Sequence, residues 1–524
     1  MLKSLPQSAA RRIISEAVMI YAADSGAIIQ SHEWVEPEAV FTRLNEQNKK
    51  GALWLDSSNA RQTQAQTQET KILSPHNRYS FIVADPYKDF ILYPHDIKAR
   101  DAMLAELDHI CTAHKNIWQD LPAAIDTQTP PFRGGIAGII GYDLLAPPNQ
   151  ENQNTPPLMP LMPLMVMGVY ASVLAFDMDE KSCFIIATGL PATTPSKRQQ
   201  AAQNAIDAWC AQLENLPAPK KPTLSPTPPK VQSNMGRGSY MQAVQDIIEH
   251  ILAGDIFQAN LAQCFTGTLP EGDTPFHYYQ RLRHISPAPF SAFGQFGEWS
   301  MASASPERFL RTHKNMIESH PIKGTRRRGH DTTSDAALKQ ALQSSDKDRA
   351  ENIMIVDLLR NDLSKTCRDH SVHVPVLCAP QSFANVHHLV SVIRAELRAD
   401  TNPFAALQAA FPGGSITGAP KKRAMEIIAA FEPTPRALSY GTCGYIGFDG
   451  TMDSSIIIRT AFMRGRHIHF HVGGGIVADS DAESEYNESL DKARDLLGAL
   501  GITSQKETLQ KEARQKETLQ KEAP

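Results

Sequence analysis

Tight turns separate successive apolar runs near the end of the chain, and this pattern constrains the fold more than any other feature of the sequence. GYIGF (444–448) is followed by an Asp-Gly turn, SIIIRTAFM (455–463) by an Arg-Gly turn, and RHIHFHV (466–472) comes last. Runs joined by such short turns pair as antiparallel strands. We therefore predict a three-stranded antiparallel meander and an α+β fold, because a doubly wound parallel fold would need helices between these strands.

Composition narrows the classes of partner and compartment. A chain of 524 residues is long enough for two or three domains or for one large composite fold. The net charge of -4 gives no electrostatic reason to bind a polyanion, so we expect no nucleic-acid partner. The seven cysteines are scattered and form no C-x-x-C pair, which favours reduced thiols in the cytoplasm over disulfides or a zinc site.

One apolar segment, residues 158–176, is nearly as long as a membrane span. Pro160 and Pro163 interrupt it, and a β-branched stretch typical of a strand follows. We interpret the segment as a buried strand and expect no membrane association.

A proline-rich segment divides the chain. Residues 216–233 have no apolar periodicity and predict a linker between an N-terminal region, 1–215, and a catalytic domain, 234–503. The remaining residues, 504–524, form a charged tail that repeats QKETLQKEA, and we assign it no chemistry.

The catalytic domain begins with a predicted helix and strand. An apolar stripe predicts a helix over Tyr240–Ala253, which Gly254 is placed to end. In the strand that follows, Ala259 and Leu261 alternate with polar residues, so Gln258 is expected to point away from the apolar face.

Two predicted helices each carry two acids three residues apart, which places the acids of each pair on one helix face. The pairs are Asp348 with Glu351 and Glu485 with Glu488. If the two faces converge, their carboxylates make a hard site suited to Mg²⁺. Taken alone, each pair is more often an exposed helix face, and an i,i+4 ion pair such as Glu488 with Lys492 is worth only about 0.3–0.5 kcal/mol.

Two glycine-rich segments could bind an anion. FPGGSITGAPKKRAMEII places Thr417 before an amphipathic helix, and a second cluster, Gly473-Gly474-Gly475, follows the last predicted strand. Glycines let a ligand approach backbone amides, and a helix N-terminus attracts a carboxylate. An ordinary capped helix start is the alternative for the first segment.

The most unusual local feature is HPIKGTRRRG, in which Lys323 ends a strand-like run before a Gly-Thr turn. Such a lysine could act as a nucleophile if its surroundings lowered its pKa. A lone lysine is more often a surface charge.

Taken together, these segments resemble the chorismate-utilising enzymes, in particular the aminodeoxychorismate synthase and anthranilate synthase component I groups. The matching segments follow in consistent order over Ser305–Lys492: SPERF, PIKGT, DRAENIMIVDLLRND, VHHLVS, FPGGSITGAPKKRAMEII, GYIGF, IIIRT, GGGIVADS and ESEYNESLDKA. The N-terminal region resembles the anthranilate synthase component I type through LWLDS, RYSFIVADP and FRGGIAGIIGYDL. The resemblance implies large antiparallel sheets packed as a sandwich with helices on the outside.

The resemblance also implies a role for each site residue. Glu351 and Glu488 would hold Mg²⁺, while Asp348 and Glu485 would act on the metal through water. Glu307 of SPERF would protonate the departing 4-hydroxyl of chorismate, with His388 beside the ring. The residues implied to bind the substrate are Gln258, Thr325, Thr417, Tyr445, Arg459, Gly474, Gly475 and Lys492.

Two positions distinguish the reactions within this family. Members that add water to chorismate have a lysine where this chain has Gln258, so ammonia is the expected nucleophile here. Anthranilate synthases have PIAGT, whereas aminodeoxychorismate synthases have PIKGT, as this chain does. In that group Lys323 would attack ring carbon 2 before ammonia enters carbon 4, giving 4-amino-4-deoxychorismate, the precursor of 4-aminobenzoate and folate.

We expect the ammonia to come from a separate glutamine amidotransferase. Cys443 lies on a predicted strand without a nucleophile elbow and is interpreted as a small buried thiol. The lyase that removes pyruvate would also be a separate protein. The alternatives are anthranilate synthase component I, which Lys323 opposes, and a non-catalytic subunit on the same scaffold, which would have lost some of these acids.

Overall fold

The structure is a computed structural model that describes residues 19–22, 24–58, 78–145, 162–218, 223, 228–383 and 386–502. The predicted charged tail, 504–524, and part of the predicted linker lie outside the described residues.

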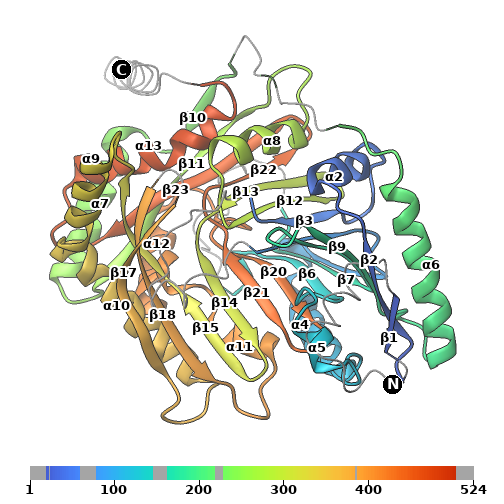
Figure 1. The fold of residues 1–524 in the computed structure, drawn as a ribbon. Coiled ribbons are helices and arrows are strands. Elements are labelled where there is room, and N and C mark those ends of the chain that lie inside the picture. Colours follow the sequence, from blue (N-terminus) through green and yellow to red (C-terminus); the bar gives the residue numbers. More distant parts are fainter. Residues whose placement is uncertain are drawn as a thin grey trace.

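Two large antiparallel sheets form the frame of the molecule (Figure 1). The strands of the 13-stranded sheet, in spatial order, are β1 (Met19–Ala22), β2 (Ala27–His32), β9 (Ser182–Ala187), β8 (Ser172–Asp177), β4 (Tyr79–Val83), β3 (Leu53–Asp56), β12 (Phe290–Phe296), β13 (Trp299–Ser305), β22 (Thr460–Arg464), β23 (His467–Ile476), β11 (Gln258–Thr268) and β10 (Val231–Ser233), with β19 (Gly418–Ala419) paired to β11. Those of the 10-stranded sheet are β16 (Ile322–Arg327), β18 (Val386–Glu396), β15 (Met316–His320), β14 (Arg308–His313), β21 (Met452–Ile456), β20 (Thr442–Gly447), β6 (Gly135–Ile140), β7 (Met165–Tyr170) and β5 (Lys88–Leu92), with β17 (His373–Ser382) paired to β18. The predicted α+β class is confirmed.

Helices cover the outer faces of both sheets (Figure 1). Against the 13-stranded sheet lie α2 (Pro37–Glu46), α6 (Pro195–Leu213), α7 (Arg237–Leu252), α8 (Pro275–Ile285), α12 (Lys421–Phe431) and α13 (Ala482–Gly498). With the 10-stranded sheet pack α4 (Arg100–Ala113), α9 (Thr332–Gln343), α10 (Asp346–Ser364) and α11 (Pro403–Ala410). The shorter helical segments are α5 (Ala123–Asp126), η2 (Pro94–Ala99), η3 (Tyr142–Leu144) and η5 (Gly414–Ile416).

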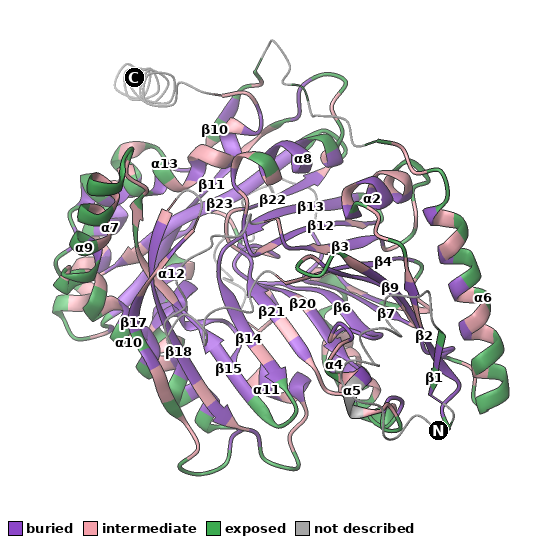
Figure 2. Cartoon of the chain, viewed as in Figure 1, coloured by how far each residue is buried: buried purple, intermediate pink, exposed green. Residues whose placement is uncertain are grey.

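Alternation of side chains along the strands explains why the 13-stranded sheet is buried on both faces. In β3, Leu53 belongs to the core between the two sheets, while its neighbour Trp54 packs in the core beneath the helices. On β4, Phe81 likewise belongs to the core between the sheets and Ile82 to the core beneath the helices. Successive side chains of a strand point to opposite faces. The inner strands of this sheet are therefore mostly buried, while its edge strands β1 and β10 and the helices α6 and α7 carry exposed residues (Figure 2).

The predicted three-stranded meander is wrong in one respect, because its middle run divides between the two sheets. Strands β20 and β21 form a hairpin in the 10-stranded sheet, and β22 and β23 form one in the 13-stranded sheet. The chain crosses between them at Ile457–Arg459, where Arg459 has a φ of 50°. A continuous apolar run therefore contains a sharp turn in the backbone.

The apolar segment 158–176 makes the same kind of crossing where it is described. Its residues form β7 and β8, which belong to different sheets and are almost entirely buried. The predicted strand character is confirmed, but there are two strands and not one. None of the described helices is both long and apolar enough to span a bilayer.

The helix predicted over Tyr240–Ala253 is confirmed as α7 (Arg237–Leu252), and Gly254 follows it with a φ of 82°. The sheets also join the two predicted regions of the chain, because β3 pairs with β12 and β6 pairs with β20. The boundaries of the predicted domains stay a prediction, but their hydrophobic cores are shared.

Candidate active site

Lys323 lies on β16 at a bulge opposite β18. The following residue, Gly324, has a φ of 70°, which favours glycine, and the register of the strand shifts between Lys323 and Thr325. Lys323 Nζ lies 3.5 Å from the carbonyl oxygen of Ser415 in the η5 turn. The bulge thus brings Lys323 to the glycine-rich segment that the sequence singled out.

Glu307 lies beside this lysine and is only 5% exposed. Burial raises the pKa of its carboxyl to about 7, against a hydrogen bond from Ser415 and the positive charge of Lys323, which both lower it. A carboxylic acid that keeps its proton near neutral pH is suited to protonate a leaving group. The predicted acid and the predicted nucleophile are therefore neighbours.

Gly475 on β23 faces both Lys323 and Gln258. A Cβ added at Gly475 would overlap with Nε2 of Gln258 and would lie 3.4 Å from Nζ of Lys323. Gln258 is fully buried, and its amide oxygen and nitrogen have no hydrogen-bond partner among the described residues. Buried amides are normally paired, so this one is available to water or a ligand.

Carboxylates from α13 approach the same strand. A Cβ added at Gly474 would lie 3.2 Å from Oε2 of Glu485, 3.5 Å from Nζ of Lys492 and 3.8 Å from Oε1 of Glu488. Lys492 donates to the carbonyl oxygen of Gly473 at 2.8 Å and pairs with Glu488 at 2.8 Å. The three-glycine run therefore makes room for these side chains.

Glu351 on α10 is within electrostatic reach of Lys323 and of both acids on α13. Burial raises its pKa, and the negative charges of Glu488 and Glu485 add to that rise, while Lys323 and Lys347 oppose it. The pKa of Glu488 is lowered chiefly by Lys492. The two helices come within ion-pair distance where Lys347 of α10 lies 3.5 Å from Glu485 of α13.

Asp348 is held differently from the other three acids. Its carboxylate accepts a hydrogen bond from Arg326 at 2.9 Å, and its backbone amide donates to the side chain of Ser345, which caps α10. The structure places Asp348 against Gly324, on the lysine side of the site.

The donor set fits a magnesium ion in its chemistry. Mg²⁺ binds through one or two carboxylates and completes its coordination with water and substrate oxygens. Glu485 and Glu488 converge over Gly474, with Glu351 in electrostatic reach of both. Within the described ranges no group of three or more His, Cys, Asp and Glu side chains is gathered closely enough to hold a metal as it stands.

His388 and Arg459 flank the bulge of β16. Nδ1 of His388 lies 3.0 Å from the hydroxyl of Thr325 and 3.3 Å from the carbonyl oxygen of Gly324. Burial, together with the charge of Arg459, lowers the pKa of His388 to about 3, so the ring is neutral at pH 7. The guanidinium of Arg459 makes no hydrogen bond or ion pair with the described residues, so it is available to an anionic ligand.

Two residues that were predicted to bind the substrate make contacts within the protein in this structure. The hydroxyl of Thr417 donates to the carbonyl oxygen of Gly413 at 3.0 Å. The ring of Tyr445 stacks on Phe132 at 4.4 Å and packs against Phe81 in the core between the sheets. The structure does not bring Tyr445 to Lys323 and the acids, and its role in binding stays a prediction.

A buried ion pair beneath the site was not predicted. Arg436 pairs with Glu432 and donates to the carbonyl oxygens of Ile416 at 2.7 Å and Asn260 at 2.6 Å. It therefore ties the η5 turn to the strand that carries Gln258. The pair lies in FEPTPRAL, where two prolines remove any helical periodicity that could have indicated it.

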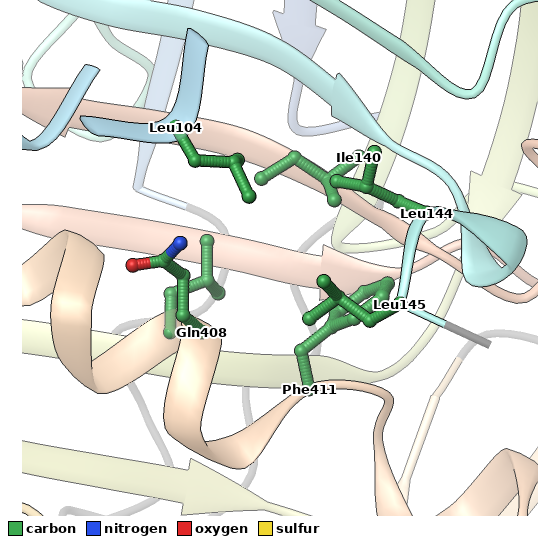
Figure 3. Close-up of a pocket in the computed structure, with 7 residues that line it drawn as sticks. Leu104, Ile140, Leu144, Leu145, Gln408 and Phe411 are labelled. Carbon is green, nitrogen blue, oxygen red and sulfur yellow. The ribbon is translucent and has the colours of Figure 1, made fainter. Parts of the chain in front are cut away.

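One small apolar cavity lies away from these residues (Figure 3). It has a volume of about 10 Å³, and its lining residues are Leu104, Ile140, Leu144, Leu145, Leu407, Gln408 and Phe411. A space of this size is at the lower limit for one water, and an apolar lining keeps it dry. It is not a substrate site.

Known proteins resemble this chain over most of its length. Residues 37–498 match the family described as chorismate binding enzyme. The chain is 37% identical over 436 residues to aminodeoxychorismate synthase component 1 of Klebsiella aerogenes, which covers 81% of this chain and 91% of that protein. It is 35% identical over 389 residues to anthranilate synthase component 1 of Bacillus caldotenax, covering 71% of this chain and 75% of that protein.

A solved structure shows the same fold. Anthranilate synthase component I from Streptococcus pneumoniae TIGR4 superposes with a TM-score of 0.67 at 28% identity, covering 84% of this chain and 95% of that one. The family match includes the 10-stranded sheet, the 13-stranded sheet apart from β1 and β2, and every residue of the site described above. The chain therefore belongs to the chorismate-binding enzyme family.

Proposed function

We propose that this chain aminates chorismate at ring carbon 4, giving 4-amino-4-deoxychorismate, with ammonia supplied by a separate glutamine amidotransferase. The observation that carries the proposal is the place of Lys323, whose Nζ lies 3.5 Å from the carbonyl oxygen of Ser415 and whose charge acts on both Glu307 and Glu351. An amine beside a protonated acid and a group of carboxylates is arranged for substitution at an allylic alcohol.

The reaction would proceed in two substitutions. Nζ of Lys323, as the free amine, forms a bond to ring carbon 2, both ring double bonds shift along the ring, and the bond from carbon 4 to its hydroxyl breaks. Glu307 gives its proton to that hydroxyl, which leaves as water. Ammonia then bonds to carbon 4, the two double bonds shift back, and the bond to Lys323 breaks, which regenerates the amine. The new ammonium group gives up one proton, which restores the acid form of Glu307.

The acids on α10 and α13 would hold Mg²⁺, with Glu351 and Glu488 as ligands and Glu485 and Asp348 supporting through water. A bound Mg²⁺ would supply positive charge for a substrate carboxylate. Arg459 and the amides around Gly474 would orient the substrate's anionic groups, since an unpaired guanidinium binds a carboxylate in a fixed geometry. Neutral His388 would lie beside the ring.

Ammonia must be made elsewhere, which is why we infer a glutaminase partner. Cys443 is 4% exposed on β20, and burial raises the pKa of its thiol to about 12, so it is no nucleophile for glutamine. All seven cysteines are free, which is consistent with the reducing cytoplasm. A separate lyase would convert the product to 4-aminobenzoate for folate synthesis.

Anthranilate synthase component I is the alternative function, and the 35% identity to the Bacillus caldotenax protein favours it almost as much as the first. Lys323 opposes it, because an anthranilate synthase needs no amine nucleophile at this position. A non-catalytic subunit is disfavoured, because Glu307 and all four acids are present.

Product analysis separates these functions. The purified chain is given chorismate, Mg²⁺ and ammonium at alkaline pH, and the products are separated before and after addition of aminodeoxychorismate lyase. We expect a product that yields 4-aminobenzoate only after the lyase is added. Fluorescent anthranilate without lyase would support the alternative, and no turnover would support the non-catalytic subunit.

A further inference from the structure

A lysine that the proposed mechanism does not use lies between the two acid-bearing helices. Lys347, in the first turn of α10, places its Nζ 3.5 Å from Oε1 of Glu485 on α13. Its charge also acts on Glu351 and Glu488. Lys347 therefore lies beside Glu485, within electrostatic reach of Glu488 and Glu351.

Lys347 is held more loosely than Lys492. Its side chain is 49% exposed and its contact with Glu485 is longer than an ordinary hydrogen bond. Lys492, in contrast, is fixed by two contacts of 2.8 Å, to Glu488 and to the carbonyl oxygen of Gly473. A long, half-exposed lysine side chain can turn into solvent at little cost.

Glu485 does not depend on Lys347 for its position. The carboxylate is 4% exposed and accepts a hydrogen bond of 2.7 Å from Ser480. It would therefore stay in place when the lysine leaves, which is what an exchange of one cation for another requires.

We propose that Lys347 is a displaceable counter-ion: it balances the charge of Glu485 and its neighbours while the metal is absent, and it moves into solvent when Mg²⁺ binds. This inference rests on the magnesium site of the proposed function. Lys347 is in this sense a positioning residue that competes with the ion, and it sets the concentration at which the site fills.

The charge of residue 347 should then control metal affinity. A positive charge near a divalent cation repels it, and removing that charge from a half-exposed position should tighten binding by about threefold to tenfold. Lys347→Arg should bind Mg²⁺ as the wild type does, Lys347→Gln more tightly, and Lys347→Glu more tightly still.

The experiment is a calorimetric titration of the full chain with MgCl₂, without chorismate, at two ionic strengths. Lys197 on α6 is the matched control, because it is exposed and its helix packs against β2 and β9. Lys197→Gln and Lys197→Glu should leave the dissociation constant unchanged. The gain at Lys347 should shrink at high salt, and thermal unfolding of each variant shows that it is folded.

Equal magnesium affinity in the Lys347 series, or no magnesium binding by the wild type, would overturn the inference. An unchanged dissociation constant with a raised KM for chorismate would also overturn it and would make Lys347 a substrate contact. These results are independent of the product formed. If the wild type released anthranilate, the proposed function would be refuted, but the inference that Lys347 is a displaceable counter-ion would still stand.

Discussion

Glu307 shows how burial alone can set the chemistry of a residue. It is a carboxylic acid with a lysine beside it, which would ordinarily favour the ionised form, yet burial raises its pKa to about 7. The residue type and its motif predicted an acid catalyst. Its burial arises in the folded chain, where Ser415 from a distant segment hydrogen-bonds to it, and no local pattern indicates either feature.

Replacing Glu307 with glutamine should separate catalysis from stability. Because the folded-state pKa of about 7 lies above the ordinary value of 4.5, the wild type loses stability as pH rises between these values. Glutamine does not titrate, so Glu307→Gln does not lose stability in this way. As pH rises from about 4.5 to 7, the free energy of unfolding of the variant minus that of the wild type should therefore increase by about 3 kcal/mol. Denaturant unfolding at pH 5 and pH 8 measures the difference, and a pH-independent difference would contradict the raised pKa.

The same variant should have lost its activity. Without a proton donor for the departing hydroxyl, kcat should fall by about a hundredfold or more. Wild-type turnover by folded Glu307→Gln would remove this residue from the mechanism.

Gly475 should tolerate no side chain, because a Cβ there would overlap with Gln258 and would approach Lys323. Gly475→Ala should reduce kcat/KM at least about tenfold, since a displacement of reacting groups by about 1 Å is costly to catalysis. The control is Gly236→Ala before α7, where nothing lies within 4 Å of the added Cβ. Steady-state kinetics on both variants test this, and equal activity would show that Gln258 and Lys323 have room to move.

At the scale of elements, the site is assembled by segments that Arg436 ties together. It joins the η5 turn to β11 through two carbonyl oxygens, and Glu432 balances its charge. The sequence predicted the strands and helices near the site, because their periodicity is local. It did not predict the crossing at Arg459, because an apolar run gives no sign of which sheet each half joins.

Breaking this pair should destabilise the protein strongly. Arg436→Met leaves Glu432 buried without its counter-ion, with only the amide of Ala262 still donating to it, and breaking a buried pair in this way typically costs about 3–5 kcal/mol. Adding Glu432→Gln to that variant should restore part of the loss, because the unpaired charge is gone. Urea unfolding measures both variants, and a loss below about 1 kcal/mol for Arg436→Met would mean that water replaces the pair.

At the scale of the whole molecule, the two predicted regions of the chain share both sheets. Pairing of β3 with β12 and of β6 with β20 joins residues on either side of the predicted linker. The family resemblance predicted a sandwich, and the chain length allowed two or three domains or one large composite fold. The sequence could not predict which strands pair across the two regions, because pairing between distant strands leaves no periodic signal in either strand.

The shared sheets predict that the regions fold together. A fragment of residues 234–503 would expose the edges of β12 and β20, so it should aggregate or fail to unfold cooperatively. Co-expression with residues 1–218 should restore a soluble complex with a single unfolding transition. A fragment that alone unfolds cooperatively and turns over chorismate would contradict this prediction.

The central claim is that Lys323 acts as the nucleophile among these acids. The most direct measurement is the rate at which Lys323→Ala forms 4-amino-4-deoxychorismate from chorismate, Mg²⁺ and ammonium, with thermal unfolding to show that the variant is folded. We expect a loss of at least about a hundredfold in kcat, because the covalent step is removed. Amination of carbon 4 by this variant at the wild-type rate would contradict it.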